Sequence, residues 1–254
     1  MAGLGDARHR TSLRRYHPKR GLSLAGFWPR TYGSHLTLLA SADFKGQTVD
    51  PVPPPEPEEP TLTADRTQLR KDARAARATF VETISPAVRR ALDEALADRL
   101  ASVIAGARVV GAHAAHGSEI DVAPALTGLD GRLAWPRIAA DGGLSFHCCD
   151  RADLVSGAHR VLEAPPGLPE ALPDLLLVPL LLFDRRGTRL GQGGGHYDRT
   201  LARLRALGPV TAVGVAFDMQ EADRLHAAPW DAPLDAIATP SRFHWCRPEA
   251  SAAP

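Results

Sequence analysis

Residues 174–201 read DLLLVPLLLFDRRGTRLGQGGGHYDRTL, a nearly unbroken apolar run followed by a turn, a glycine cluster and a plausible helix. An apolar run of this length, ended by Asp184 and Gly187, is typical of a strand buried on both faces, as in a parallel sheet. Pro179 inside the run favours a bulge or a sheet edge, because proline cannot donate to a ladder of hydrogen bonds. The DRRG segment at 184–187 indicates a turn.

The glycine cluster after this turn predicts a phosphate site. Residues 191–195 read GQGGG and are followed directly by the expected helix. Glycines let a backbone approach a ligand closely, and the N–H groups at a helix start attract anions with the help of the helix dipole. Asp198 falls in the first helical turn, where it suits a metal ion that bridges phosphates. Positive charge on one side comes from Arg185, Arg186 and Arg189.

The glycine count by itself fits a tight turn as well as it fits a ligand loop. The stretch is not a Walker loop, because no Gly-Lys-Ser/Thr follows it. It also differs from the dinucleotide-binding fingerprint, because the sixth position counted from Gly191 is His196. The glycines therefore predict a loop and a helix start, and leave the ligand open.

Composition excludes several classes of protein. The chain has 254 residues, 44% of them hydrophobic, and a net charge of +1, which allows an ordinary core and gives no bulk attraction to nucleic acid. No apolar run reaches the roughly 18 residues of a membrane span. The cysteines are Cys148, Cys149 and Cys246; two of them are adjacent, so a secreted disulfide framework is not expected, and their spacing matches no zinc pattern.

Residues 1–60 differ from the rest of the chain. Seven basic side chains accompany one acid, Asp6, in the first 40 residues, and residues 51–60 read PVPPPEPEEP, which is typical of an extended linker. A disordered basic tail, an organellar targeting segment and an upstream start codon all fit this beginning. We expect a basic extension and Pro-rich linker over 1–60, an α/β domain over 61–247 and a tail over 248–254.

Two helices are expected after the linker. The first runs from about Asp65 to Thr79 and carries an arginine face beside its apolar stripe. A solvated basic face is the ordinary explanation of such a run. The second begins at Ser85-Pro86, a cap followed by a first-turn proline, and ends at Gly106. We expect it to serve packing only.

Strands and helices then alternate, which predicts an α/β fold with a three-layer, open, mostly parallel sheet, helices on both faces and a Rossmann-like topology. Trp135 is expected in the core, with the lining of a ligand pocket as the alternative. Arg137 is a candidate for pairing with carboxylates of a ligand. Glu119 lies in a loop after a strand, where open α/β sheets bind ligands, although it could equally cap a helix. The expected strands cover residues 108–114, 132–138, 144–148, 174–183, 209–217 and 234–239, with a helix over 197–207.

The string VPLLLFDRRGTRLGQGGGHYDRTL closely resembles the signature of the 5-formyltetrahydrofolate cyclo-ligases, vPgLaFD-x-x-G-x-RLGxGxGyYD. The resemblance covers about Asp65 to Thr239. It also includes residues 66–70, RTQLR, beside the family's K-x-x-L-R, and residues 230–235, WDAPLD, beside the family's h-D-v-P-L-D. Arg66 stands where the family usually has Lys, His196 where it usually has Tyr, and Trp230 where it usually has His.

The resemblance implies a role for each matched residue. It implies catalytic roles for Tyr197 and Arg189, and metal binding by Asp198 and Asp231. It implies that folate is bound by Glu119, Ala114, His196 and Tyr197. It implies that ATP is bound by Arg66, Arg70, Arg189, Gly191, Gln192, Gly193, Gly194, Gly195 and Asp198.

The activity that the resemblance implies is the ATP-dependent conversion of 5-formyltetrahydrofolate to 5,10-methenyltetrahydrofolate, through a phosphorylated formyl group, with release of ADP and phosphate. Mg²⁺ is the implied metal. We expect a cytoplasmic monomer that acts on folate, with or without a polyglutamate tail, and binds neither nucleic acid nor membrane. The alternative is a diverged nucleotide-binding relative that acts on another substrate or has no catalytic role.

Overall fold

The computed structural model describes residues 62–157 and 160–246. The basic extension and linker expected over 1–60 and the tail expected over 248–254 lie outside the described residues. Those expectations therefore stay predictions, and so does the boundary between linker and domain.

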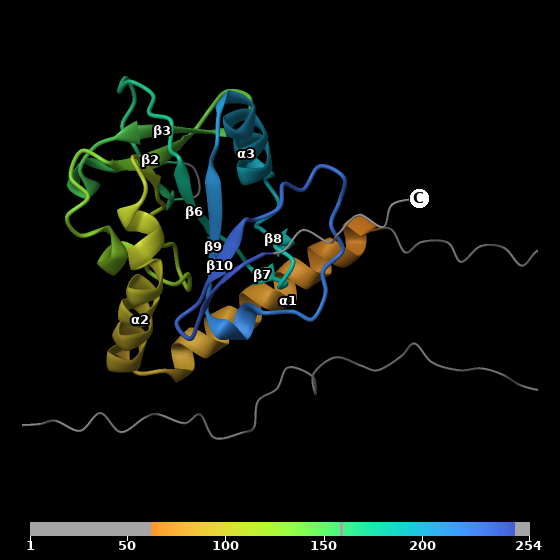
Figure 1. Cartoon of the computed structure of the whole chain (residues 1–254). Coiled ribbons are helices and arrows are strands. Elements are labelled where there is room, and N and C mark those ends of the chain that lie inside the picture. The colour runs from red at the N-terminus through yellow and green to blue at the C-terminus, as the bar shows by residue number, and fades with distance from the viewer. Residues whose placement is uncertain (1–61, 158–159, 247–254) are drawn as a thin grey trace, which may run out of the picture. The chain divides into compact units, whose positions relative to one another are not determined.

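A seven-stranded sheet forms the centre of the described part, with the order β11-β10-β9-β6-β1-β2-β3 (Figure 1). Neighbours from β10 to β2 are parallel, and the edge strands β11 and β3 are antiparallel to their neighbours. The parallel strands follow the order 2-1-3-4-5 of doubly wound sheets, so the predicted α/β class is confirmed. The strands are β1 (Val110–Gly111), β2 (Leu133–Ile138), β3 (Leu144–Cys148), β6 (Leu175–Pro179), β9 (Thr211–Val215), β10 (Ala236–Ala238) and β11 (Phe243–Trp245).

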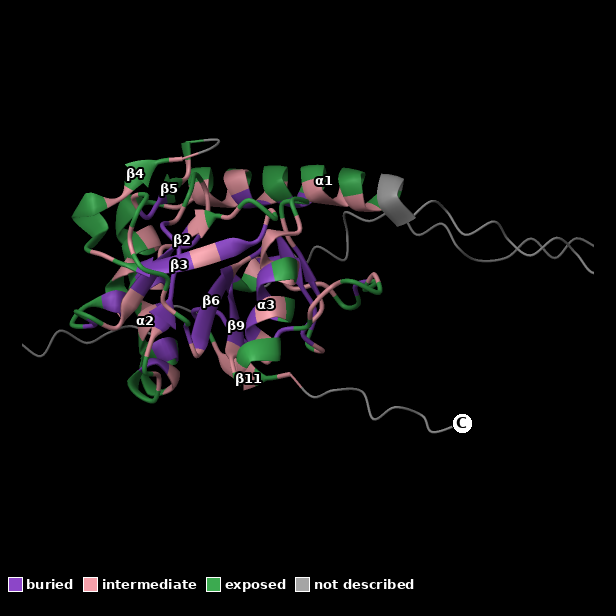
Figure 2. Ribbon diagram, turned by 90° about the horizontal axis from the view of Figure 1, so that it is seen from above, coloured by how far each residue is buried: buried purple, intermediate pink, exposed green. Residues whose placement is uncertain are grey.

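Strand β6 is buried on both faces because its side chains alternate between two cores. Leu175 and Leu177 pack with helix α2 on one face, and Leu176 and Val178 pack with helix α3 on the other. None of these four side chains is more than 2% exposed. Figure 2 shows β6 and β9 as buried strands in the middle of the sheet. The unbroken apolar run is therefore explained by a strand that has a hydrophobic layer on each side.

Pro179 does not mark a bulge or a sheet edge, so that expectation is wrong. β6 lies between β1 and β9, and Pro179 is its last residue, opposite Val215. The chain then leaves the main sheet and forms a separate hairpin, in which β7 (Leu182–Phe183) pairs with β8 (Arg189–Leu190). A proline at the end of a central strand removes a donor where the ladder stops, which costs the sheet no hydrogen bond.

Three helices cover the sheet and this hairpin. α2 (Pro86–Ala105) begins as predicted, because Ser85 Oγ accepts a hydrogen bond from the N–H of Val88 at 3.3 Å. α3 (His196–Leu207) covers the opposite face through Leu201 and Leu204. α1 (Leu62–Thr83) is longer than expected and packs Ala73 against the hairpin. The shorter elements are η2 (Ala123–Leu126), η3 (Arg151–Asp153), β4 (Val155–Ser156), β5 (Leu162–Glu163) and η5 (Asp218–Gln220).

The strand order predicts a ligand crevice at the carboxyl ends of β1 and β6. From β1 the chain moves to β2 on one side, and it later returns to β6 on the other side. Doubly wound sheets bind ligands at this switch point, because the loops leaving the two strands diverge there. The loop after β1 carries Glu119, and the segment after β6 leads into the glycine loop.

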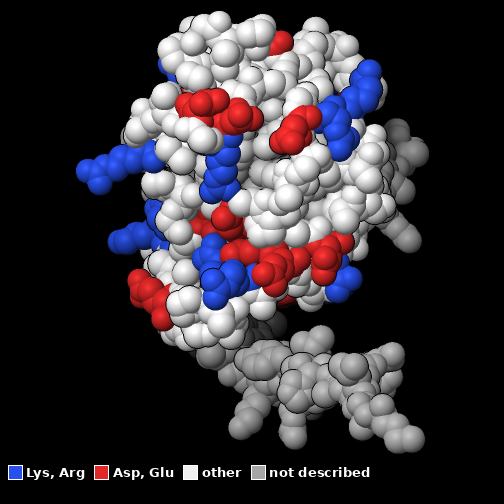
Figure 3. Space-filling view, turned by 90° about the vertical axis from the view of Figure 1, so that its left-hand side faces the viewer, with Lys and Arg blue, Asp and Glu red and all other residues white. Residues whose placement is uncertain are grey.

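The face on the α2 side carries both basic and acidic side chains, and neither kind covers it continuously (Figure 3). Among the helices of residues 62–157 and 160–246, none combines the length and apolar composition that a membrane crossing requires.

A buried carboxylate holds the β7–β8 turn together. Asp184 is 0% exposed and accepts hydrogen bonds from the N–H groups of Arg186, Thr188 and Leu225 at 3.0, 3.1 and 3.0 Å. The Arg186 guanidinium donates to its second oxygen at 2.8 Å. Burial alone would raise the pKa of Asp184, but these donors outweigh it and hold the pKa below its ordinary value.

We predict that Asp184→Asn lowers the free energy of unfolding by about 3 kcal/mol, since the change removes charge from a buried, fully bonded group. Arg185→Gln is the matched control, because Arg185 is an exposed neighbour that pairs with Glu221, and it should cost less than about 1 kcal/mol. Urea denaturation of both variants measures the two values.

The pH dependence of the Asp184→Asn effect follows from the lowered pKa. A carboxyl group with a lowered folded pKa stabilises fully above its unfolded value of about 3.9, and this stabilisation is lost as pH falls through the folded pKa. The loss caused by the substitution should therefore be equal at pH 5 and pH 8. A loss that already shrinks between these values would mean that the pKa is not lowered.

Candidate active site

Arginines of α1 hold the glycine loop. Arg70 Nε donates to the carbonyl oxygen of Gly191 at 3.1 Å. Arg74 donates to the Gln192 side-chain oxygen at 3.2 and 2.7 Å. A Cβ atom on Gly193 would lie 3.4 Å from Arg70 Nε, so the loop backbone passes close against this guanidinium. The basic face of α1 is thus directed at the glycine loop, and the solvated-face interpretation does not hold for Arg70.

The loop conformation depends on two of its glycines. Gly193 has φ 107° and Gly195 has φ 65°, values that side-chain-bearing residues rarely adopt. Gly195 directly precedes α3, so the first N–H groups of that helix open beside the loop. The first N–H groups of an α-helix have no acceptor within the helix, because no helical carbonyl precedes them by four residues. The loop and the helix start therefore present backbone amides, the arrangement that suits a phosphate.

Two carboxylates, those of Asp198 and Asp231, act on the charge of Arg189. Asp198 Oδ1 is 2.5 Å from the Arg189 guanidinium and also accepts from the N–H of Ala232 at 3.1 Å. Arg189 donates in addition to the carbonyl oxygen of Ala232. The neighbouring Asp231 forms a two-pronged pair with Arg66, at 2.7 and 3.2 Å. Asp198 and Asp231 are therefore brought together, 33 positions apart in sequence, through Ala232 and the arginines.

The charges of this cluster are balanced internally. Burial lowers the pKa of Arg189, while Asp198 and Asp231 act in the opposite direction. The described residues contain no group of three or more His, Cys, Asp or Glu side chains arranged for a metal. Mg²⁺, however, is commonly held by one or two carboxylates together with substrate phosphates. Asp198 and Asp231 fit that requirement.

Glu119 is held at the crevice by a buried arginine. Its Oε2 accepts from the N–H of His116 at 3.1 Å, and its Oε1 lies 3.8 Å from Arg77. Arg77 is 3% exposed and donates to Ser118 Oγ and to the carbonyl oxygen of Leu180, each at 3.1 Å. Arg77 therefore ties the loop after β1 to the segment after β6.

Helix α2 also supports this loop, so the expectation that it serves packing only is wrong. Arg89 donates to the carbonyl oxygen of Glu119, and its guanidinium lies 5.0 Å above the Phe217 ring. Buried Asp93 accepts from the N–H of Asp121 at 3.0 Å and pairs with Arg89. The polar residues of α2 that face the sheet thus fix the backbone on both sides of Glu119.

The remaining predicted folate residues have different surroundings. Tyr197 packs on the α3 side of the core, and burial together with the Glu119 charge raises its pKa, so its hydroxyl stays a neutral donor. His196 Nδ1 lies 2.6 Å from the carbonyl oxygen of Gly142. The methyl group of Ala114 is buried on the α2 side, which leaves only its backbone for a ligand.

Two residues near Glu119 were missed as site candidates. Arg77 belongs to the arginine face of α1, but its position in sequence does not reveal that it is buried. His113 is 6% exposed; its Nδ1 lies 3.3 Å from the carbonyl oxygen of Leu177, and its Nε2 has no partner among the described residues. Burial lowers the pKa of His113, which Glu119 opposes. Side chains alternate between the two faces in extended backbone. Because Ala112 and Ala114 pack on the α2 side, this alternation places His113 on the other side, and it could have identified His113 from the sequence.

Other candidates have partners elsewhere. Arg185 pairs with Glu221 and Arg186 with Asp184, so these two arginines do not join Arg189. Arg137 donates to the carbonyl oxygen of Ala164 at 2.9 Å. Trp135 is fully buried, as expected for a core residue.

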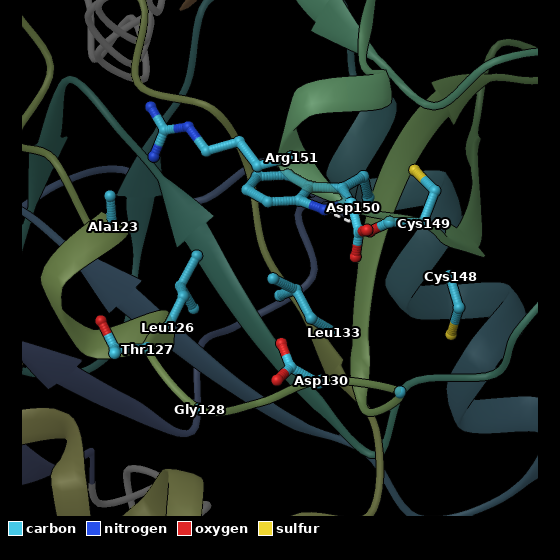
Figure 4. Close-up of a pocket in the computed structure, with 12 residues that line it drawn as sticks. Ala123, Leu126, Thr127, Gly128, Asp130, Leu133, Cys148, Cys149, Asp150 and Arg151 are labelled. Atoms are coloured by element: carbon cyan, nitrogen blue, oxygen red, sulfur yellow. Dashed lines mark hydrogen bonds between the residues drawn. The ribbon is translucent and has the colours of Figure 1, made fainter.

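A cavity of about 410 Å³ lies apart from this cluster, beside Cys148 and Cys149 (Figure 4). It is lined by Leu133, the first residue of β2, and by η2, whereas the crevice lies at the carboxyl ends of the strands. The cavity is therefore separate from the candidate site.

Known proteins with similar sequences are 5-formyltetrahydrofolate cyclo-ligases. The 5-formyltetrahydrofolate cyclo-ligase of Escherichia coli K12 is 37% identical over 107 residues, which are 40% of this chain and 57% of that protein. The enzyme of the same name from Mycolicibacterium smegmatis is 33% identical over 172 residues, 63% of this chain and 88% of that protein. The alignment with the E. coli relative thus spans little more than half of its length.

Solved structures share the fold. The 5,10-methenyltetrahydrofolate synthetase of Aquifex aeolicus superposes with a TM-score of 0.60 at 27% identity, covering 74% of this chain and 96% of that one. The synthetase of Mycoplasma pneumoniae has a TM-score of 0.53 at 23% identity, covering 69% and 99%, and supports the fold alone. The model of the 5-formyltetrahydrofolate cyclo-ligase family matches residues 62–240, and the chain belongs to this family.

Proposed function

We propose that this protein is an ATP-dependent 5-formyltetrahydrofolate cyclo-ligase that forms 5,10-methenyltetrahydrofolate, ADP and phosphate. The observation that carries the proposal is the contact of Arg70 with the glycine loop at the crevice where Arg77 anchors Glu119. Arginines of α1 thus contact both the glycine loop, the proposed phosphate site, and the Glu119 carboxylate. Membership of the family supports the reaction.

The chemistry explains why such a site is needed. A formamide oxygen is a poor leaving group, so N10 of the folate cannot close the ring on the formyl carbon unaided. Transfer of the γ-phosphoryl group of ATP to that oxygen gives an iminium phosphate and ADP. N10 then bonds to the formyl carbon and loses its proton, the C–O bond breaks, and phosphate leaves with the oxygen and takes up that proton. Such a transfer depends on alignment and positive charge more than on covalent protein chemistry.

The residues of the cluster suit these steps. Arg66, Arg70 and Arg189, with the amides of residues 191–195, supply donors and positive charge for the triphosphate. The neutral Tyr197 hydroxyl is a donor for the formyl oxygen or the transferred phosphoryl group. The Glu119 carboxylate can accept two parallel N–H bonds from the pterin. Ala114 through its backbone and His196 through its ring complete the proposed folate contacts.

Asp198 and Asp231 would hold the magnesium ion. When bound, the ion neutralises charge on the phosphates and keeps them aligned. Arg189 and Arg66, the present partners of these carboxylates, are then free to turn to phosphate oxygens. The exchange keeps every charge paired, which limits its cost.

We also propose that the protein works in the cytoplasm as a monomer, on folates with or without a polyglutamate tail, and without nucleic acid or membrane partners. Free Cys148, Cys149 and Cys246 are typical of a reducing compartment. The net charge of +1 gives no general attraction to polyanions.

Of three predictions on activity, the first tests the reaction. The full chain, given ATP, Mg²⁺ and 5-formyltetrahydrofolate, should produce the absorbance of the methenyl product with one ADP released per product. Omission of ATP or addition of a chelator should abolish it. ATP binding without any methenyl product would point instead to a diverged relative with another substrate.

The second prediction tests whether Arg70 binds the triphosphate of ATP. Arg70→Ala should raise KM for ATP at least about tenfold, because a charge-assisted contact to phosphate is lost. KM for 5-formyltetrahydrofolate should stay within about twofold. Lys71→Ala is the matched control on the same helix and should leave both constants unchanged, since Lys71 is exposed. Equal KM values for ATP in Arg70→Ala and the parent would remove Arg70 from the site.

The third prediction separates the folate half from the ATP half. Glu119→Gln should raise KM for 5-formyltetrahydrofolate about tenfold or more and leave KM for ATP nearly unchanged, because the amide cannot accept two N–H bonds in parallel. Asp121→Asn, two positions along the same loop, is the control. A rise confined to KM for ATP would contradict the assignment of Glu119.

A further inference from the structure

Trp230 is a large aromatic side chain left in solvent beside the arginine cluster. It is 76% exposed, the highest value among the exposed large apolar side chains of the described residues. An indole in water forgoes the stabilisation that burial of its apolar surface would give, unless a ligand covers it.

The backbone that carries Trp230 is held firmly. Asp231 N donates to the carbonyl oxygen of Ala228 at 2.9 Å, and Ala228 N donates to the Asp231 carboxylate at 2.8 Å. Arg66 grips the same carboxylate and also lies 3.4 Å from the carbonyl oxygen of His226. Trp230 therefore sits on a four-residue turn that its own hydrogen bonds close, and without ligand this turn lies against α1.

This turn and the glycine loop are joined by one turn of α1. Arg66 contacts Asp231, and Arg70, four residues later, contacts Gly191. Four helical residues rise about 6 Å, so the two contact points are neighbours along the helix. A nucleoside attached to a triphosphate is long enough to cross that distance. The indole is thus within reach of the base when the phosphates lie at the loop.

We propose that Trp230 stacks on the purine base of ATP and so makes the site prefer the nucleotide over its bare triphosphate. This inference rests on the proposed function, since it assumes that the triphosphate lies at the glycine loop. An aromatic ring can stack on a base of any kind, because every base has a π-face. The arginines hold the charged end of the ligand, and Trp230 covers its apolar end.

Two binding experiments on the full chain with Mg²⁺ test the proposal. In the first, calorimetry compares ATP with inorganic triphosphate for the parent and Trp230→Ala. The substitution should raise Kd for ATP about tenfold, in the range that loss of one base–aromatic stack produces, and leave Kd for triphosphate unchanged. Trp245→Ala is the matched control, because Trp245 is 59% exposed on β11 and should have no effect on either ligand.

In the second experiment, intrinsic fluorescence is followed during titration. ATP should quench the parent and Trp245→Phe, inorganic triphosphate should quench neither, and Trp230→Phe should lose the ATP response. Because Trp230 is exposed, all variants should keep the parent's circular dichroism and melting temperature.

The outcomes separate this proposal from the function it rests on. If Trp230→Ala and the parent bind ATP equally, or if triphosphate quenches as strongly as ATP, the stacking proposal is overturned while turnover can stand. If ATP binds with the expected Trp230 dependence but no methenyl product forms, the stacking proposal stands and the proposed function fails. If the parent binds neither ligand, both are overturned.

Discussion

The contact between the guanidinium of Arg70 and the carbonyl of Gly191 is the interaction on which the site depends. It joins the first described helix to a loop that begins 121 positions later. Without it and the neighbouring contacts of Arg74 and Arg77, apolar contacts alone would hold the β7–β8 hairpin to α1. Apolar contacts set the separation of two elements but not their register. The hydrogen bonds of Arg70, Arg74 and Arg77 fix the position of the hairpin along α1, because a hydrogen bond requires a particular distance and direction.

The positive charges of these arginines disfavour one another, and nearby carboxylates compensate them. Burial disfavours the charged forms of Arg70 and Arg189 and so lowers their pKa values. The positive charge of Arg66 also repels that of Arg70. Asp198 and Asp231 offset this in the protein alone. The paired side chains are already mostly removed from water. An anion that binds these guanidinium groups therefore displaces little water from them, which lowers the desolvation cost of binding. In the proposed reaction the triphosphate and its metal ion would take over the two halves of these pairs.

Much of this arrangement could be predicted from the sequence, because its causes are local. The apolar run of 175–178 requires a layer on each side, and the glycines at 193 and 195 adopt conformations that other residues avoid. Ser85 and Pro86 mark the start of α2 as a cap and a first-turn proline. One wrong expectation was that Pro179 marks a bulge or a sheet edge. A missing N–H donor fits a sheet edge and the end of a central strand equally well, so the sequence could not distinguish the two.

The rest was hidden because it depends on pairs that are distant in the chain. Arg77 and Arg74 are both arginines on one face of α1, yet Arg77 is buried and Arg74 exposed. Only the position of Leu180 and Ser118 explains the difference, since their oxygen atoms receive the Arg77 guanidinium. The partners of α2 are hidden in the same way: Asp93 reads as a polar residue in an amphipathic helix until the N–H of Asp121 meets it. A periodic pattern identifies which face of a helix is polar, whereas the role of each polar side chain is decided by the backbone group that the tertiary fold brings to it.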